Sequence, residues 1–322
     1  MDFQPTEDQR DLRAGVRGLL EGRYGREALR AAVDAAAGAG DGAGAGTAVD
    51  RGLWRELGEA GFFALRLPES EGGVGLGLPE AVLVFEEAGR ALVPGPLVAT
   101  HLAAGVVPGA AAGTAVVTAF DLAGDRAGDL VAYLGEADAV LGAAVLPGGE
   151  PVRAADPLTP LHRVARPDGA DVSAYGSAYG SAYVSEGALL TAALQVGSAL
   201  RTVELAVRYA GEREQFGQPI GAFQAVKHLC AQMLVRAEVA RTAVYAAAVT
   251  GDPGEAVGAK LLADEAAVRN ARDCLQVHGG MGFTWEADVH LHLKRAWVRA
   301  EQWRTAAEAE ELLAAELLDS AG

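Results

Sequence analysis

Residues 201–228 read RTVELAVRYAGEREQFGQPIGAFQAVKH, and this stretch decides the fold of the chain. Apolar residues recur at helical intervals on both sides of GQPIG, whose glycines and proline break a helix. Similar breaks follow at TGDPGE and HGGMG, and the sequence between them has a helical pattern. About four helices follow from residue 186 onward, the number found in an antiparallel four-helix bundle. We therefore expect a C-terminal bundle domain, 186–322.

The sequence before the bundle predicts a small β-rich middle domain and connector, 111–185. TAVVTAF, DLVAYL and AVLGAAV are short runs of β-prone residues, separated by Gly, Pro and Asp. SAYGSAYGSAY, 173–183, is a tandem repeat with neither a helical period nor turn chemistry. We expect this repeat to be a connector into the bundle.

The first part of the chain, 1–110, predicts a helical domain, so the fold class is mainly α with a small β middle domain. Thr6 and Gln9 have capping-box spacing, which predicts a helix beginning near Thr6. After Arg30 the sequence becomes glycine-rich, which predicts a loop whose first residues can extend a helix. The stretch from Trp54 predicts two further helices around a glycine loop, the second ended by Pro94.

Composition and charge exclude several classes of protein. The chain is 50% hydrophobic but only 6% aromatic, which is typical of helices packed through Ala, Leu and Val. Its formal charge of −16 would repel a phosphate backbone, so we expect no nucleic-acid partner. Cys230 and Cys274 lack ligand-like spacing, which favours free thiols in a reducing compartment. No apolar stretch is long enough to cross a bilayer, and we expect a cytoplasmic protein.

Two motifs in the bundle resemble the acyl-CoA dehydrogenase family. REQFGQPI followed by FQ matches the family signature Arg-x-x-Phe-Gly-x-x-Ile and Phe-Gln, and LQVHGGMGF matches Gln-x-x-Gly-Gly-x-Gly-(Phe/Tyr), at family spacing. Trp54, Pro68, GGVG and EEAGRAL resemble the family's first domain. The resemblance implies a helical N-terminal domain, a β middle domain, a four-helix bundle and FAD shared at an interface between two subunits.

Carried over by position, the resemblance implies a set of residues that hold the adenosine and pyrophosphate of a flavin whose ring lies in the neighbouring subunit. An arginine fork suits pyrophosphate oxygens, amides suit the adenosine end, and glycines admit a close ligand. Taken singly, an arginine usually meets solvent or a carboxylate, and HGG is often only a helix end. The implied cofactor-binding residues are Arg213, Phe216, Gln224, Gln276, Val277, His278, Gly279 and Gly280.

The family's catalytic glutamate is missing at its expected position. Its reaction needs a base for the α-proton of an acyl thioester while hydride passes to the flavin. Counting from Gly279 at family spacing gives Trp303, and an indole has only an N–H donor. In another branch the base precedes REQFG, and that count gives Gly187, beside Glu186. Glu186 is therefore only a weak substitute, because one residue turns a helical side chain by about 100°. Glu301 and Glu308 are expected to be solvated.

The middle domain is shorter than the family's and lacks Thr-Glu-Pro-x-x-Gly-Ser-Asp and Trp-Ile-Thr, which hold the flavin ring. The resemblance thus implies the short subunit of a heteromeric α2β2 enzyme, with no catalytic residue of its own. A complete dehydrogenase chain would supply the base and bind most of the acyl-CoA, and electron-transfer flavoprotein would accept the electrons. TWEADVHLHLKRA resembles the steroid side-chain enzymes, which implies a steroid-linked acyl-CoA.

Other readings stay open. The chain could be a structural or binding homologue without chemistry, since fold does not imply function. It could also act alone as a homo-oligomer with an atypical base. A metal site at His290 and His292 is disfavoured, because residues two apart point to different sides of a helix. We expect His278 and His228 to be packed or capping residues.

Overall fold

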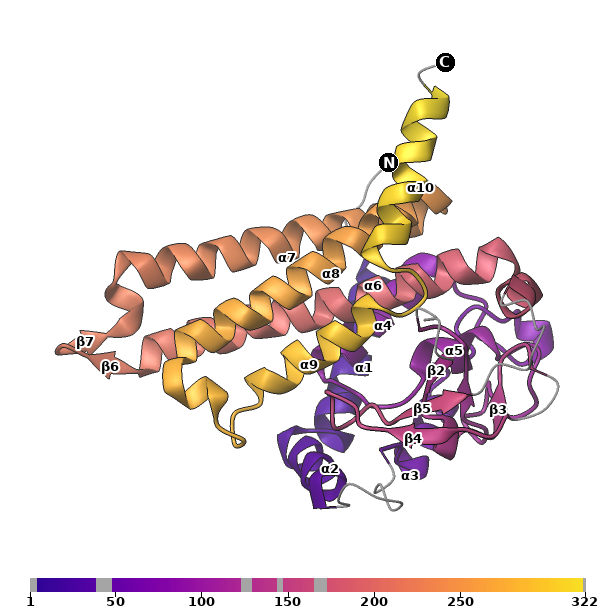
Figure 1. Cartoon of the computed structure of the whole chain (residues 1–322), viewed down its shortest axis with the longest axis horizontal. Helices are drawn as coiled ribbons and strands as arrows, with labels where there is room; N and C mark the ends of the chain where they lie inside the picture. Colours follow the sequence, from indigo (N-terminus) through magenta and orange to yellow (C-terminus); the bar gives the residue numbers. More distant parts are fainter. Residues whose placement is uncertain (1–4, 39–47, 123–128, 144–146, 165–172, 321–322) are drawn as a thin grey trace.

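A computed structural model describes residues 5–38, 48–122, 129–143, 147–164 and 173–320. Three long helices, α6 (Ser173–Glu212), α7 (Gln224–Thr250) and α8 (Pro253–His278), lie side by side with the shorter α9 (Val289–Ala300), and the N-terminal helices and short strands gather around one end of α6 (Figure 1). The last helix projects away from this body (Figure 1). The predicted fold class, mainly α with a small β part, is confirmed.

The N-terminal helices begin and end largely where the sequence predicts. Thr6 and Gln9 form both bonds of the capping box, so the helix near Thr6 is confirmed. The segment after Arg30 stays helical for longer than predicted because its first residues are mostly alanines, which favour helix. Residues 39–47, the rest of that predicted loop, lie outside the described residues. The helices are α1 (Glu7–Arg23), α2 (Arg26–Gly38), α3 (Arg51–Glu59), α4 (Leu78–Arg90) and α5 (Leu97–Leu102).

A buried group of charges joins α1 to α4. The Arg13 guanidinium lies 2.5 Å from the Glu86 carboxylate and 2.6 Å from the Glu87 carboxylate, and Arg17 reaches Glu87 at 2.7 Å. The Tyr245 hydroxyl donates to Glu86 at 2.7 Å. Burial alone would raise the pKa of Glu87, but hydrogen bonds from Arg17 and Arg13 outweigh burial and lower it. These carboxylates therefore hold α1 in place on α4.

The middle of the chain forms two small sheets among the described residues. The three predicted runs each contain a strand, and two further strands were missed because they alternate poorly between apolar and polar residues. One sheet is a parallel pair and the other is antiparallel in the order β2-β5-β4. The strands are β1 (Val117–Thr118), β2 (Asp129–Ala132), β3 (Ala139–Val140), β4 (Glu150–Val152) and β5 (Leu161–Val164).

The bundle begins earlier than the sequence predicts. The repeat 173–183 was expected to be a connector, and this is wrong because α6 already begins at Ser173. Adding a turn to an existing helix avoids the cost of nucleation, so residues with modest helix propensity follow the packed part of α6. The predicted breaks at GQPIG, TGDPGE and HGGMG are confirmed. The helices are α6 (Ser173–Glu212), α7 (Gln224–Thr250), α8 (Pro253–His278), α9 (Val289–Ala300) and α10 (Ala306–Ser320).

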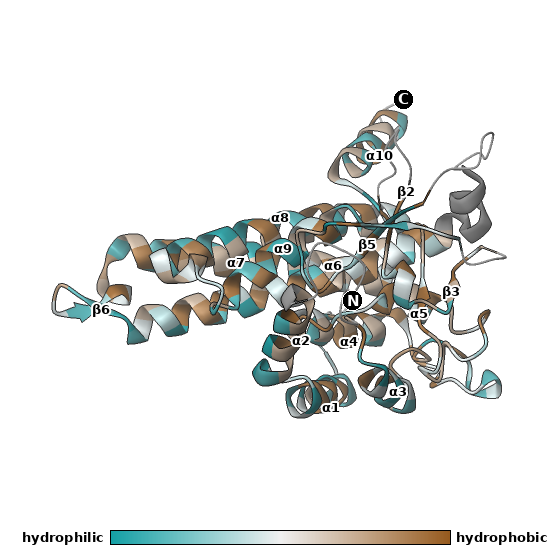
Figure 2. Cartoon of the chain, turned by 60° about the horizontal axis from the view of Figure 1, so that its bottom comes forward, coloured by the Kyte–Doolittle hydropathy of each residue, from teal (hydrophilic) through white to brown (hydrophobic). Residues whose placement is uncertain are grey.

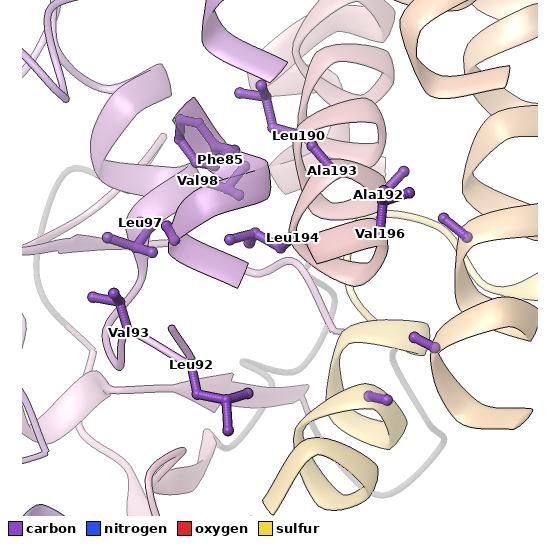
Figure 3. Close-up of a cluster of buried hydrophobic side chains, with 14 of the residues drawn as sticks. Phe85, Leu92, Val93, Leu97, Val98, Leu190, Ala192, Ala193, Leu194 and Val196 are labelled. Carbon is purple, nitrogen blue, oxygen red and sulfur yellow. The ribbon is translucent and has the colours of Figure 1, made fainter. Parts of the chain in front are cut away.

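The main core lies where α4 and α5 pack against α6. Figure 3 shows Phe85 and Val98 on one side facing Leu190 and Leu194 on the other, all of them buried. The backbones of α4 and α6 approach closely at a glycine, because a Cβ at Gly197 would lie 1.9 Å from the Glu86 carbonyl oxygen. Apolar and polar segments alternate along α7 and α10 (Figure 2), and among their apolar residues Val235, Val239 and Leu312 are exposed.

Candidate functional site

A hairpin at one tip of the bundle carries the REQFG motif. β6 (Glu214–Gln215) pairs with β7 (Gln218–Pro219), and Phe216 and Gly217 both adopt positive φ in the turn between them. A positive φ is unfavourable for a phenylalanine, yet the Phe216 side chain is 92% exposed. The turn therefore presents an aromatic ring to solvent at the tip of the bundle.

The HGG segment at the end of α8 lies beside the base of this hairpin. The His278 ring stacks on Tyr209, near the end of α6, with ring centroids 4.2 Å apart. The Arg213 backbone amide donates to the Tyr209 carbonyl at 2.8 Å. The hairpin therefore begins directly beside the Tyr209 residue on which His278 stacks. Gly279 has a φ of +57° and a ψ of −140°, a conformation that L side chains rarely adopt. The two motifs, which are distant in sequence, thus meet at one end of the bundle.

Most of the predicted cofactor residues are accessible at this end. Arg213, Gln224 and Gln276 are exposed, and a Cβ added at Gly279 or Gly280 would meet nothing within 4 Å. The Val277 side chain is buried in the core, which leaves only its backbone for a ligand. Burial lowers the pKa of His278, and the charge of Arg208 adds to this effect, so the surroundings disfavour the charged ring.

Trp303 and Gly187, the two positions at which the family places its base, lie against each other. The Trp303 side chain is only 9% exposed, and a Cβ at Gly187 would come within 2.3 Å of the indole ring. Trp303 adopts a φ of +60°, and its backbone amide donates to the Asp121 backbone carbonyl at 2.5 Å. The indole therefore fills the space above Gly187, between the two positions that the family spacing gives for a base.

Glu186, the weak substitute for the base, is occupied by other partners. Its carboxylate forms an ion pair with Arg66 and lies 3.7 Å from His101 Nε2. Burial favours the protonated acid, but the nearby His101 ring and the ion pair with Arg66 outweigh it, so the pKa of Glu186 is lowered. A carboxylate held charged in this way is a poor proton acceptor. Sequence reasoning missed Arg66 and His101, which come from distant parts of the chain and carry no motif.

Another acid, Asp121, lies beside Trp303, and sequence reasoning missed it. Asp121 accepts a hydrogen bond from the Gln302 side chain at 2.8 Å, while its Oδ1 is buried without a hydrogen-bond partner among the described residues. Burial raises the pKa of Asp121 to about 7. Asp121, Trp303 and the buried Arg299 line a cavity of about 30 Å³, which is enough for a water or two but not for an acyl group.

The remaining predicted groups have structural roles. His292 is buried and its Nδ1 lies 2.7 Å from the Ser198 hydroxyl, whereas His290 stacks on Trp285. The described residues contain no cluster of three potential metal ligands. His228 is exposed within α7, whose caps are Phe223 and Gly251, so the prediction that it is a packed or capping residue was wrong.

Glu308 exchanges hydrogen bonds with Thr305 at the start of α10. The two cysteines are free thiols, as predicted.

Comparison with known proteins identifies the protein family to which this fold and these two motifs belong. Residues 6–118 match the family model for the acyl-CoA dehydrogenase N-terminal domain, and 176–307 match that for the acyl-CoA dehydrogenase C-terminal domain. The chain is 36% identical to acyl-CoA dehydrogenase IpdE2 of Mycobacterium tuberculosis, over 98% of this chain and 99% of that protein. The chain therefore belongs to the acyl-CoA dehydrogenase family.

Other relatives differ in length and assembly. Acyl-CoA dehydrogenase FadE34 of Mycobacterium tuberculosis is 35% identical over 97% of this chain, which spans only half of that protein's length. A chain of the ChsE4–ChsE5 complex from the same organism superposes with a TM-score of 0.76 and 25% identity, over 99% of both chains. Butyryl-CoA dehydrogenase from Megasphaera elsdenii shares the fold, with a TM-score of 0.79 and 21% identity, over 99% of this chain and 100% of that one. No helix in the described part of the chain is long and apolar enough to span a membrane.

Proposed function

We propose that this chain is the non-catalytic subunit of a heteromeric acyl-CoA dehydrogenase. It completes the adenosine end of an FAD site across the subunit interface, while a second dehydrogenase chain holds the flavin ring and supplies the base. One observation carries the proposal: the Trp303 indole packs against Gly187, so neither position at which the family places its base can act on a substrate.

The end of the bundle that carries REQFG and HGG fits the tail of a dinucleotide. Arg213 offers a planar fork of donors for a pyrophosphate, while Gln224 and Gln276 offer amides for an adenosine. All three side chains are exposed, so a ligand held mainly by a partner can reach them. Bound FAD would supply the hydride acceptor, and this chain's residues would only bind and orient its tail.

Several features support a partner of the same family. FadE34 matches this chain over only half of its length, which is the arrangement expected if two dehydrogenase units are fused in one polypeptide. The ChsE4–ChsE5 relative is itself a complex, and a chain of the Tcur3481–Tcur3483 steroid ACAD has the same fold. We accordingly propose a steroid-linked acyl-CoA as substrate, bound mainly by the partner, with electron-transfer flavoprotein as acceptor, in the cytoplasm.

A self-sufficient dehydrogenase with an atypical base is the second candidate, since Asp121 lies beside Trp303 with a pKa of about 7. The cavity there is too small for an acyl chain, and Glu186 is already paired with Arg66. Both observations favour the non-catalytic role.

The test is the flavin content of the chain produced alone and co-expressed with a neighbouring dehydrogenase gene. We expect little FAD in the lone chain and stoichiometric FAD in a stable complex, measured by flavin absorbance after size-exclusion chromatography. Trp303→Glu should not give the lone chain dehydrogenase activity, because its ring site is also incomplete. Full FAD in the lone homo-oligomer, or turnover by its Trp303→Glu variant, would overturn the proposal.

A further inference from the structure

A pocket of about 320 Å³ lies between the N-terminal helices and the bundle. The end of α1, the start of α2, the end of α4 and one face of α6 surround it, and it shares no lining residue with the cavity beside Trp303. A pocket of this volume is within the range that holds small organic ligands. None of the predicted flavin-tail residues lines it.

The lining of this pocket carries an excess of positive charge in a strongly acidic protein. Five arginines and three carboxylates line it, while the chain as a whole has a formal charge of −16. Arg90 and Arg201 share one carboxylate, that of Glu204. Arg208 is exposed and makes no ion pair with any other described residue. The guanidinium groups of Arg201 and Arg208 are therefore not fully neutralised by protein groups.

The arginines combine with an apolar wall. Arg201, Leu205 and Arg208 line the pocket from successive turns of one face of α6, because their spacing is i, i+4 and i+7. Leu20, from α1, and Leu92, after α4, are each about 1% exposed and lie on the lining as well. Tyr24 also lines the pocket, and its buried hydroxyl has no hydrogen-bond partner among the described residues. The site offers charge-assisted donors beside a hydrophobic surface.

We propose that this pocket binds a small organic anion with an apolar body, whose carboxylate or phosphate pairs with Arg201 and Arg208. A guanidinium fork matches either oxyanion in bidentate geometry, and the leucines and Tyr24 exclude water from the apolar part. Such a ligand would bridge the N-terminal domain and the bundle, and it would do so independently of the flavin and of the partner chain.

Isothermal titration of the full chain at low salt tests the proposal, with octanoate, octyl phosphate and inorganic phosphate as probes. We expect one octanoate or one octyl phosphate per chain, whichever oxyanion the arginines prefer, and at least tenfold weaker binding of inorganic phosphate. Arg208→Gln should weaken the preferred probe at least tenfold, because it removes a charge-assisted bond. Arg208→Lys should recover part of that loss.

Two control variants distinguish binding in this pocket from a general loss of positive charge and from binding at the proposed flavin-tail site. Arg269→Gln removes an exposed arginine of α8 that pairs with Glu265, and it should leave the affinity unchanged. Arg213→Ala, at the proposed flavin-tail site, should also leave it unchanged. Arg208→Gln should leave the fold intact, because that side chain is exposed. The proposal fails if neither alkyl probe binds, if inorganic phosphate binds as tightly as they do, or if Arg208→Gln binds normally.

Discussion

At the scale of single residues, the proposed non-catalytic role depends on what fills the space beside Gly187. The sequence predicts the loss at Trp303, because the spacing from Gly279 places an indole where a carboxylate is needed. It does not predict that Trp303 would lie on Gly187, since that contact joins two positions far apart in the chain. Nor does any local signal mark Arg66, which forms an ion pair with Glu186, or His101, whose Nε2 lies 3.7 Å from the Glu186 carboxylate.

The contact between Trp303 and Gly187 can be measured by a double-mutant cycle. Gly187→Ala should lower the free energy of unfolding by about 1–3 kcal/mol, because its Cβ has no room beside the indole. In a Trp303→Gly background, most of that cost should disappear. Urea unfolding of the four proteins gives the coupling.

Gly211→Ala is the matched control, because a Cβ at this other glycine of α6 meets nothing within 4 Å. It should be neutral or slightly stabilising. Equal costs of Gly187→Ala in the two backgrounds would show that the indole does not fill the space above Gly187.

We expect the buried Asp121 carboxyl to make the free energy of unfolding depend on pH. Its pKa is raised from 3.8 to about 7, so between these values the folded protein keeps a proton that the unfolded chain loses. Stability contributed by this group is therefore complete at low pH and declines as pH rises to about 7. Asp121→Asn keeps an acceptor for Gln302 and should be more stable than the natural protein at pH 8, by on the order of 1–3 kcal/mol.

The difference between Asp121→Asn and the natural protein should vanish at pH 4, where Asp121 is uncharged in the folded state. Denaturant midpoints at pH 4, 6 and 8 measure it. A difference that does not change with pH would mean that Asp121 has an ordinary pKa.

At the scale of elements, the sequence predicts helices better than strands. The capping box at Thr6 and the glycine breaks of the bundle are local signals, and both are confirmed. β4 and β5 were missed because a short strand depends on its neighbours in the sheet rather than on its own pattern. The helical state of the repeat 173–183 was missed for a related reason, since continuation of α6 outweighs local propensity.

The docking of α1 onto α4 depends on the buried Glu87 carboxylate. Glu87→Gln should lower the free energy of unfolding by about 3 kcal/mol, because Arg13 and Arg17 lose a charged acceptor in a buried place. The lowered pKa of Glu87 means that its contribution is complete above pH 4.5 and is lost as pH falls further. The acid limb of the stability curve should accordingly be shallower in Glu87→Gln.

Glu80→Gln is a suitable control on the same helix, because its partners Gln9 and Gly77 carry no charge. Chemical denaturation between pH 3 and 7 compares the two variants. A Glu87→Gln protein with unchanged stability and an unchanged acid limb would show that α1 is held by its apolar face alone.

At the scale of the whole molecule, the order of the patterns along the chain predicts a division into domains, but it does not predict how chains assemble. The outward-facing valines of α7, Val235 and Val239, are 62% and 51% exposed, and the turn at Phe216 holds its ring in solvent. These features are what a subunit with unmet contacts would show. The sequence alone shows that these residues lie in helices or turns, but it does not show that their side chains are exposed on the surface.

The proposed division of labour between two chains is tested most directly by FAD retention in an Arg213→Ala complex. Removing a charge-assisted hydrogen bond to the pyrophosphate should cost about 1.5–3 kcal/mol, or roughly tenfold to more than a hundredfold in affinity. Arg213→Lys should recover only part of this, since an ammonium lacks the planar fork. FAD per heterodimer, measured after size-exclusion chromatography, should fall with activity while assembly is kept. An Arg213→Ala complex that assembles, holds full FAD and turns over normally would contradict the placement of this chain at the cofactor.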